Sequence, residues 1–176
     1  EGVLKILQES KDRLRNLETR GEQLAEIEKE KEALLRTLRT QGGALRAKRS
    51  GAANRLALAV TQELRALGFA HGSFSVELRD AEPHLSGLDD IEFGFAPNVG
   101  EPMRPLRAIA SSGEISRVML ASKAVLAGHD RIPVMVFDEI DANVGGEMGS
   151  AVGRKLAEVA RQHQVICITH LPQVAV

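Results

Sequence analysis

The chain has 176 residues, of which 43% are apolar and 27% are charged, and its formal net charge is −1. This composition predicts a globular cytoplasmic protein with a buried core, and no apolar run approaches the roughly 20 residues that a membrane-spanning helix needs. The lone cysteine, Cys167, excludes an internal disulfide. The absence of Trp and Tyr argues against a surface that stacks single-stranded bases.

A heptad pattern dominates the N-terminal part of the chain and predicts one long helix over residues 2–40. Gly42 and Gly43 weaken the pattern, and a helix is expected to resume over residues 44–67 and to stop at Gly68. Such a stripe needs a partner helix, so we expect one arm of an antiparallel coiled coil. The apolar seam has spacings of three, four and seven residues: Leu17, Leu24, Ile27, Leu34, Leu38 and Leu45.

A basic segment lies within this helical region, because residues 33–62 contain no acid. One interpretation is contact with a nucleic-acid backbone, in which Lys and Arg neutralise phosphates. The alternative is a solvated helix face, because the charges spread around the helix. The basic residues are Arg36, Arg39, Arg46, Lys48, Arg49 and Arg55, and the last four are the candidate DNA contacts.

After the helix, the apolar residues recur at every second position. Alternation predicts antiparallel strands at residues 73–79 and 91–95, joined by a loop at residues 80–89. Helices are then expected at residues 113–127 and 146–162. These elements indicate an α/β fold.

The most informative segment is the apolar run at residues 134–137, which leads directly into Asp138, Glu139 and Asp141. The run predicts a buried strand of a parallel sheet, whose carboxyl end is where ligands of open α/β folds bind. One carboxylate there can hold Mg²⁺, and the next can orient a water for attack on a phosphate. The alternative is a strand followed by an ordinary acidic turn.

Two further elements carry the same chemistry. Small residues from Ala110 to Gly113 precede a helix, and the open N–H groups at that helix start can bind an anion, although Ser111 or Ser112 with Glu114 can also be an ordinary cap. A second buried strand at residues 165–168 ends in Thr169 and His170. Strand, helix and strand predict a parallel βαβ unit, which would bring His170 beside Asp138 and Glu139.

Together these motifs resemble the C-terminal lobe of an ABC-type ATPase head. Ala110-Ser-Ser-Gly-Glu114 is similar to its signature loop, Val134-Met-Val-Phe-Asp-Glu139 to its Walker B strand, Asp141 to its D-loop acid and His170 to its switch histidine. The preceding helical arm narrows the resemblance to the SMC-like branch that acts in bacterial DNA repair. The expected division is a coiled-coil arm at residues 1–67 and an ATPase lobe at residues 68–176.

The resemblance implies roles for single residues, with ATP and Mg²⁺ as cofactors. Asp138 would help to hold Mg²⁺, Glu139 would polarise the attacking water, and His170 would contact the γ-phosphate. The cofactor-binding residues of the signature loop and D-loop would meet nucleotide on the opposite head: Ser111, Ser112, Gly113, Glu114 and Asp141. Ser112 departs from the family pattern, which has glycine there, so the phosphate contact is expected to be modified rather than lost.

The chain contains no Gly-x-x-x-x-Gly-Lys-Ser/Thr loop. We therefore expect it to be a piece of a longer protein, inactive alone, whose N-terminal lobe carries the Walker A loop. The implied function is ATP-driven dimerisation of two heads that clamp or bridge DNA during double-strand break repair and recombination, away from any membrane. The alternatives are another SMC-like head, for chromosome condensation or association with a nuclease, and a non-catalytic coiled-coil scaffold.

Overall fold

The computed structural model describes residues 2–175 and divides into two compact units, with the boundary between Leu45 and Arg46. The sequence analysis places the division between residues 67 and 68 instead. The difference arises because the last turns of the long helix contribute Val60 and Leu64, both fully buried, to the core of the second unit. This part of the helix therefore belongs physically to the lobe.

Helix α1 runs from Gly2 to Ala66 without a break. The predicted interruption near Gly42 and Gly43 is wrong. A helical glycine costs only about 1 kcal/mol relative to alanine, and the flanking residues are strong helix formers. The end of the helix is as predicted: Gly68 has a φ of +94°, and Phe69 N donates to Leu64 O at 3.0 Å.

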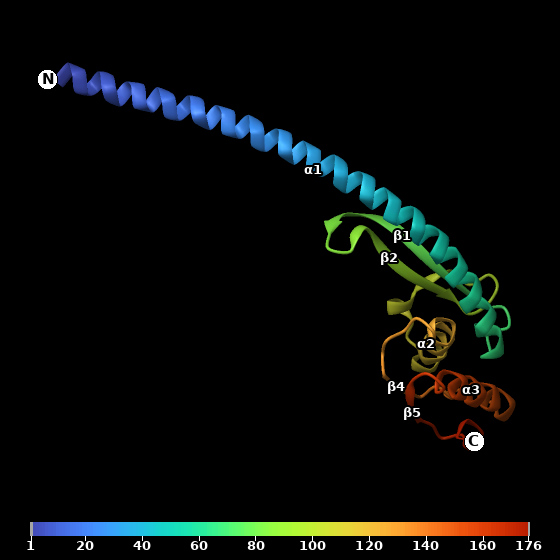
Figure 1. The fold of residues 1–176 in the computed structure, drawn as a ribbon. Helices are drawn as coiled ribbons and strands as arrows, with labels where there is room; N and C mark the ends of the chain where they lie inside the picture. Colours follow the sequence, from blue (N-terminus) through green and yellow to red (C-terminus); the bar gives the residue numbers. More distant parts are fainter. Residues whose placement is uncertain (1, 176) are drawn as a thin grey trace. The chain divides into compact units, whose positions relative to one another are not determined.

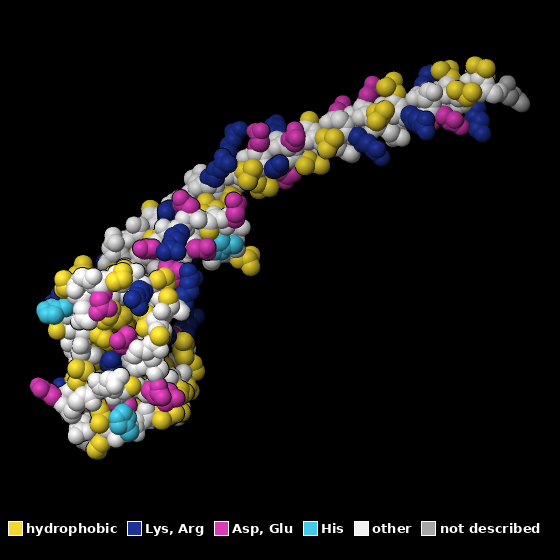
Figure 2. Space-filling model, turned by 180° about the vertical axis from the view of Figure 1, so that it is seen from behind, with side chains coloured by type: hydrophobic (Ala, Val, Ile, Leu, Met, Phe, Trp, Pro, Cys, Tyr) yellow, Lys and Arg dark blue, Asp and Glu magenta, His cyan; other side chains and the backbone are white. Residues whose placement is uncertain are grey.

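The unit up to Leu45 presents its heptad seam to solvent, with exposed fractions from 38% at Leu45 to 64% at Leu17. Figure 2 shows apolar, basic and acidic side chains mixed along this helix. Because an apolar seam of this length is normally buried against another helix, the partner helix stays a prediction.

In the second unit, strands β1 (Ser73–His84) and β2 (Gly87–Ala96) form an antiparallel hairpin, and the short strand β3 (Arg104–Pro105) pairs with β2. Figure 1 shows the hairpin alongside the C-terminal part of α1. The predicted loop at residues 80–89 is wrong, because both strands continue through it to a tight turn. Alternation is lost there because these residues lie mostly at the surface, where neither face of the hairpin is in the core.

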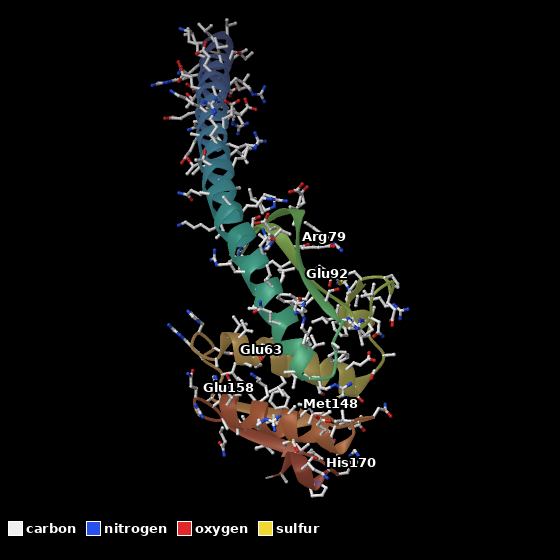
Figure 3. The ribbon with its side chains drawn as sticks, turned by 90° about the vertical axis from the view of Figure 1, so that its right-hand side faces the viewer. Glu63, Arg79, Glu92, Met148, Glu158 and His170 are labelled. Atoms are coloured by element: carbon white, nitrogen blue, oxygen red, sulfur yellow. The ribbon has the colours of Figure 1, made fainter. Side chains whose placement is uncertain are left out.

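The hairpin extension is held against α1 by ion pairs. Arg46 contacts Asp80 and, at 2.8 Å, Asp89, while Arg49 lies 3.4 Å from Asp89 and donates to Ser86 O at 2.6 Å. The Asp89 side chain is fully buried. Further along the hairpin, Arg79 of β1 faces Glu92 of β2 at 3.6 Å (Figure 3).

The rest of the lobe is a βαβ unit with one helix before it. After the short 3-10 turn η1 (Leu106–Ala108), helix α2 (Ser112–Leu126) precedes strand β4 (Val134–Asp138), helix α3 (Gly146–Val159) and strand β5 (Gln164–Ile168), and η2 (Pro172–Val174) follows. Strands β4 and β5 pair in parallel, as predicted.

One face of the β4–β5 pair packs into the core through Met135 and Phe137, which are each 6% exposed. The opposite face is open in the described structure, so the expectation of a strand buried on both faces does not hold within these residues. Parallel sheets are normally covered on both sides. The exposed apolar side chains of this face are Val134, Val136, Ile166 and Ile168.

Because only one of two leucines in the same helix lies in the lobe core, we expect their alanine variants to differ strongly in the free energy of unfolding. Leu64→Ala should lower the free energy of unfolding by about 2–5 kcal/mol, because Leu64 is completely buried. Leu58→Ala, at a position that is 64% exposed, is the matched control and should change it by less than about 0.5 kcal/mol. Urea unfolding followed by circular dichroism measures both, and equal effects would mean that this turn of α1 is not part of the core.

Candidate functional site

The candidate site lies where β4 and β5 end. The register pairs Asp138 with Ile168, so the residues that follow each strand, Glu139 and Thr169-His170, leave the sheet at the same edge. Asp138 and Glu139 are exposed. The prediction that the two strand tips lie next to each other is therefore confirmed.

Glu139 begins a tight turn with an unusual backbone. Its φ is +54°, which is uncommon for a residue other than glycine, and Ala142 N donates to Glu139 O at 3.0 Å. Gly113 approaches this turn so closely that an added Cβ would lie 2.9 Å from Ala142 Cβ and 3.1 Å from Glu139 O. The glycine at position 113 is thus required by packing against the turn.

The N-terminus of α2 has the serine cap that was one of the two predicted alternatives, and the anion site stays a prediction. Ser111 caps the helix, accepting from Glu114 N at 3.3 Å, and its hydroxyl hydrogen remains able to donate to an anion. The Ser112 hydroxyl donates to Glu139 Oε2. The signature-like loop and the acidic strand tip are therefore in direct contact.

Two residues of α2 that the sequence analysis did not single out also hold the β4 tip. Ser116 Oγ donates to Asp138 O at 2.9 Å, and Arg117 Nη1 donates to Ile140 O at 3.3 Å and Ala142 O at 3.0 Å. The Arg117 guanidinium also lies 5.1 Å from the centre of the Phe69 ring. Burial lowers the pKa of Arg117 from its ordinary value. A buried arginine that donates to backbone carbonyls leaves no recognisable pattern in a sequence.

Asp141 joins the two strand tips. Its carboxylate is 1% exposed, and Oδ2 accepts from Thr169 Oγ1, from His170 N at 2.9 Å and from Leu171 N at 3.0 Å. Burial raises the pKa of this carboxyl, but the hydrogen bonds outweigh burial, so the pKa lies below its usual value. The buried position differs from the expected one, in which Asp141 meets a second head.

His170 contacts Asp141 rather than the two acids at the strand tip. Its Nδ1 lies 3.2 Å from Asp141 Oδ2, and its side chain is 70% exposed. Among the residues that the structure describes, Asp141 is the only acid within ion-pair distance of the His170 ring. Figure 3 shows His170 beyond the end of β5 at the surface of the lobe. We expected His170 to lie directly beside Asp138 and Glu139. The two strand tips do share an edge of the sheet, but the acidic side chain that His170 contacts is Asp141.

The four candidate DNA contacts divide into two pairs. Arg46 and Arg49 are engaged with Asp89, as described above, whereas Lys48 and Arg55 are exposed and have no ion pair with a described residue. Acids of the hairpin, which are distant in sequence, therefore neutralise half of the basic set.

Comparison with known proteins gives one consistent result. The chain is 41% identical to the DNA repair protein RecN of Mycobacterium leprae over 99% of this chain, and 46% identical to that of Xylella fastidiosa over 72% of it. The chain belongs to the RecN family. It spans 33% and 23% of the length of these two RecN proteins. No protein-family model matches the chain.

Solved structures support the fold of this RecN chain. It is similar to the Smc head domain of Pyrococcus yayanosii, with a TM-score of 0.54 and 26% identity over 73% of this chain and 23% of the other. The Smc head of Pyrococcus furiosus, solved with the C-terminal domain of ScpA, gives a TM-score of 0.53 at 24% identity over 73% of this chain and 30% of the other. The predicted fold class, an SMC-like head lobe with a long N-terminal helix, is confirmed.

The buried Asp141 carboxylate predicts a pH-dependent contribution to stability. Because its pKa is lowered in the folded state, the stabilisation is present above the unfolded pKa, about 3.9, and is lost as the pH falls through the lower folded value. Asp141→Asn should therefore cost about 1–3 kcal/mol at pH 7, and less as the pH falls below about 4.

The exposed Asp138 is the matched control for this measurement, since Asp138→Asn removes a carboxylate from the same edge and should change stability little. Urea unfolding between pH 7 and pH 3 measures both variants. A cost for Asp141→Asn that is independent of pH would show that its carboxylate does not titrate differently on folding.

Proposed function

We propose that this chain forms the C-terminal lobe of the ATPase head of a RecN-type protein acting in DNA double-strand break repair and recombination. The observation that carries the proposal is the meeting of three elements in one lobe: the β4 tip, the N-terminus of α2 and the β5 tip with His170. The relatives are DNA repair proteins of the RecN family, and this supplies the biological context.

The oxygen ligands at the β4 tip fit a complex of Mg²⁺ with a nucleotide, because Mg²⁺ prefers oxygen ligands. The described residues contain no group of three or more His, Cys, Asp or Glu side chains that could hold a metal ion by themselves. Mg²⁺ commonly uses one or two carboxylates together with waters and phosphate oxygens, so the single exposed carboxylate of Asp138 is an adequate protein ligand. The ion would neutralise charge on the phosphates.

Glu139 and His170 have separate roles in this proposal. Glu139 is an exposed carboxylate with a backbone fixed by the turn, so it can orient and polarise a water. His170 is exposed, with Nδ1 directed to Asp141, which leaves its Nε2 side for a phosphate oxygen. Thr169 and the buried Asp141 carboxylate hold the loop that carries His170.

The signature-like residues would act on a second head. Ser111, Gly113 and Glu114 lie at the N-terminus of α2, where unpaired N–H groups and the helix dipole favour an anion. Two heads that share two ATP molecules would form a clamp, and hydrolysis would release it.

An N-terminal lobe with a Walker A loop would complete the head. The open face of the β4–β5 pair, with its four exposed apolar side chains, is the surface on which we place that lobe. A parallel sheet exposed on one side has an apolar surface that the rest of an α/β fold normally covers. The exposed heptad seam from Leu17 to Leu45 similarly requires the other arm of a coiled coil.

Glu139→Gln in the full-length RecN protein tests the function. Loss of the carboxylate should lower ATP turnover by at least about 100-fold while nucleotide-bound dimers accumulate. Turnover is measured by phosphate release and dimerisation by light scattering. Glu147→Gln, an exposed acid in the first turn of α3, is the matched control. Unchanged turnover in Glu139→Gln would show that Glu139 is not the group that acts on water, whereas the non-catalytic scaffold predicts no ATP turnover in the unmodified protein.

DNA binding is expected to depend on Lys48 and Arg55. Reversing both charges to Glu should weaken binding and reduce the slope of log affinity against log salt by about 2, since each phosphate contact contributes roughly 0.9. Arg154→Glu, an exposed charge reversal on α3, is the control. Fluorescence anisotropy with duplex DNA at several salt concentrations measures the slope, and an unchanged slope would make this segment a solvated helix face.

A further inference from the structure

Ser112 stands where the resemblance to SMC-like heads predicts glycine, and its hydroxyl donates to the side chain of Glu139. A glycine at position 112 would have no group able to make this hydrogen bond. The contact therefore depends on the serine at position 112. It connects the helix start proposed to face another head with the carboxylate proposed to act on water in its own head.

The contact lies in a well-defined framework. Helix α2 is fixed to the β4 tip by the Ser116–Asp138 O and Arg117–Ala142 O hydrogen bonds and by the close approach of Gly113 to the Glu139 turn. All three act on backbone atoms or on packing. Among the residues that the structure describes, the Ser112 hydroxyl is the group that hydrogen-bonds the Glu139 side chain itself.

The two possible partners of the Ser112 hydroxyl compete. A serine hydroxyl has one hydrogen to donate, so it can donate either to Glu139 Oε2 or to an anion at the N-terminus of α2. While it donates to Glu139, one carboxylate oxygen is occupied and the rotamer of the side chain is restrained. When an anion takes the hydrogen, both carboxylate oxygens become available to a water.

We infer that Ser112 is a positioning residue that restrains Glu139 until a phosphate oxygen binds at the N-terminus of α2. The inference rests on the proposed function and deepens it, because it couples anion binding at the start of α2 to the state of the carboxylate. A glycine at this position would leave the two sites without this link.

The hydrogen bond is tested first without nucleotide. In the ¹³C-labelled chain, Ser112→Ala should shift the Glu139 carboxyl carbon resonance, whereas Ser112→Thr, which keeps a hydroxyl, should leave it nearly in place. Ser122→Ala is the matched control, because Ser122 Oγ donates to Val118 O within the same helix. A Glu139 resonance that responds equally to Ser112→Ala and Ser122→Ala would overturn the inference.

The consequence is tested by turnover in the full-length protein. Ser112→Ala and Ser112→Gly should each raise basal ATP turnover about two- to tenfold, the effect of releasing one hydrogen bond at the surface. Ser122→Ala, which removes a hydroxyl that bonds only within α2, should remain near the unmodified protein. Unchanged or lower turnover in both the Ala and Gly variants would overturn the restraint.

Glu139→Gln separates this result from failure of the proposed function. If Glu139→Gln abolishes turnover while the Ser112 variants have no effect, the ATPase assignment stands and only the restraint is refuted. If Glu139→Gln keeps full turnover, Glu139 is not the group that acts on water, and both proposals fail.

Discussion

The parallel pairing of β4 with β5 is the constraint on which the site depends. Its register sets Asp138 opposite Ile168, so that the next residues of both strands emerge at one edge of the sheet. A shift by one residue would turn Met135 and Phe137 from the core to the open face. Core packing and site geometry therefore select the same register.

Asp141 converts this shared edge into a defined arrangement. A buried carboxylate is costly unless it is hydrogen-bonded, and here the donors come from the loop that follows β5. The loop carrying His170 is thus held by an acid from the loop after β4. Arg117 supports the β4 side of this connection by donating to Ile140 O and Ala142 O, on either side of Asp141. The chain of contacts runs from α2 through this turn to His170.

Local patterns in the sequence predicted much of this structure. Alternation, apolar runs and Gly68 located most strands and the end of α1, and the Asp-Glu and Thr-His pairs marked the two strand tips that lie at one edge of the sheet. Long-range contacts were not predictable in this way. The hairpin extension depends on Arg46 and Arg49 meeting Asp89, some forty residues away, and no periodicity signals such a pairing. The inward position of Asp141 likewise depends on donors nearly thirty residues later.

Two features that look unfavourable in isolation have the same explanation. The heptad seam from Leu17 to Leu45 and the open face of the β4–β5 pair both expose apolar side chains that folded proteins normally cover. Each surface belongs to an assembly that needs a second part: the seam is one helix of a coiled coil, and the open face is one uncovered side of a parallel sheet. In an SMC-like head, a single additional segment that contains a helical arm and a lobe would cover both. The two exposed apolar surfaces therefore support the same proposed partner.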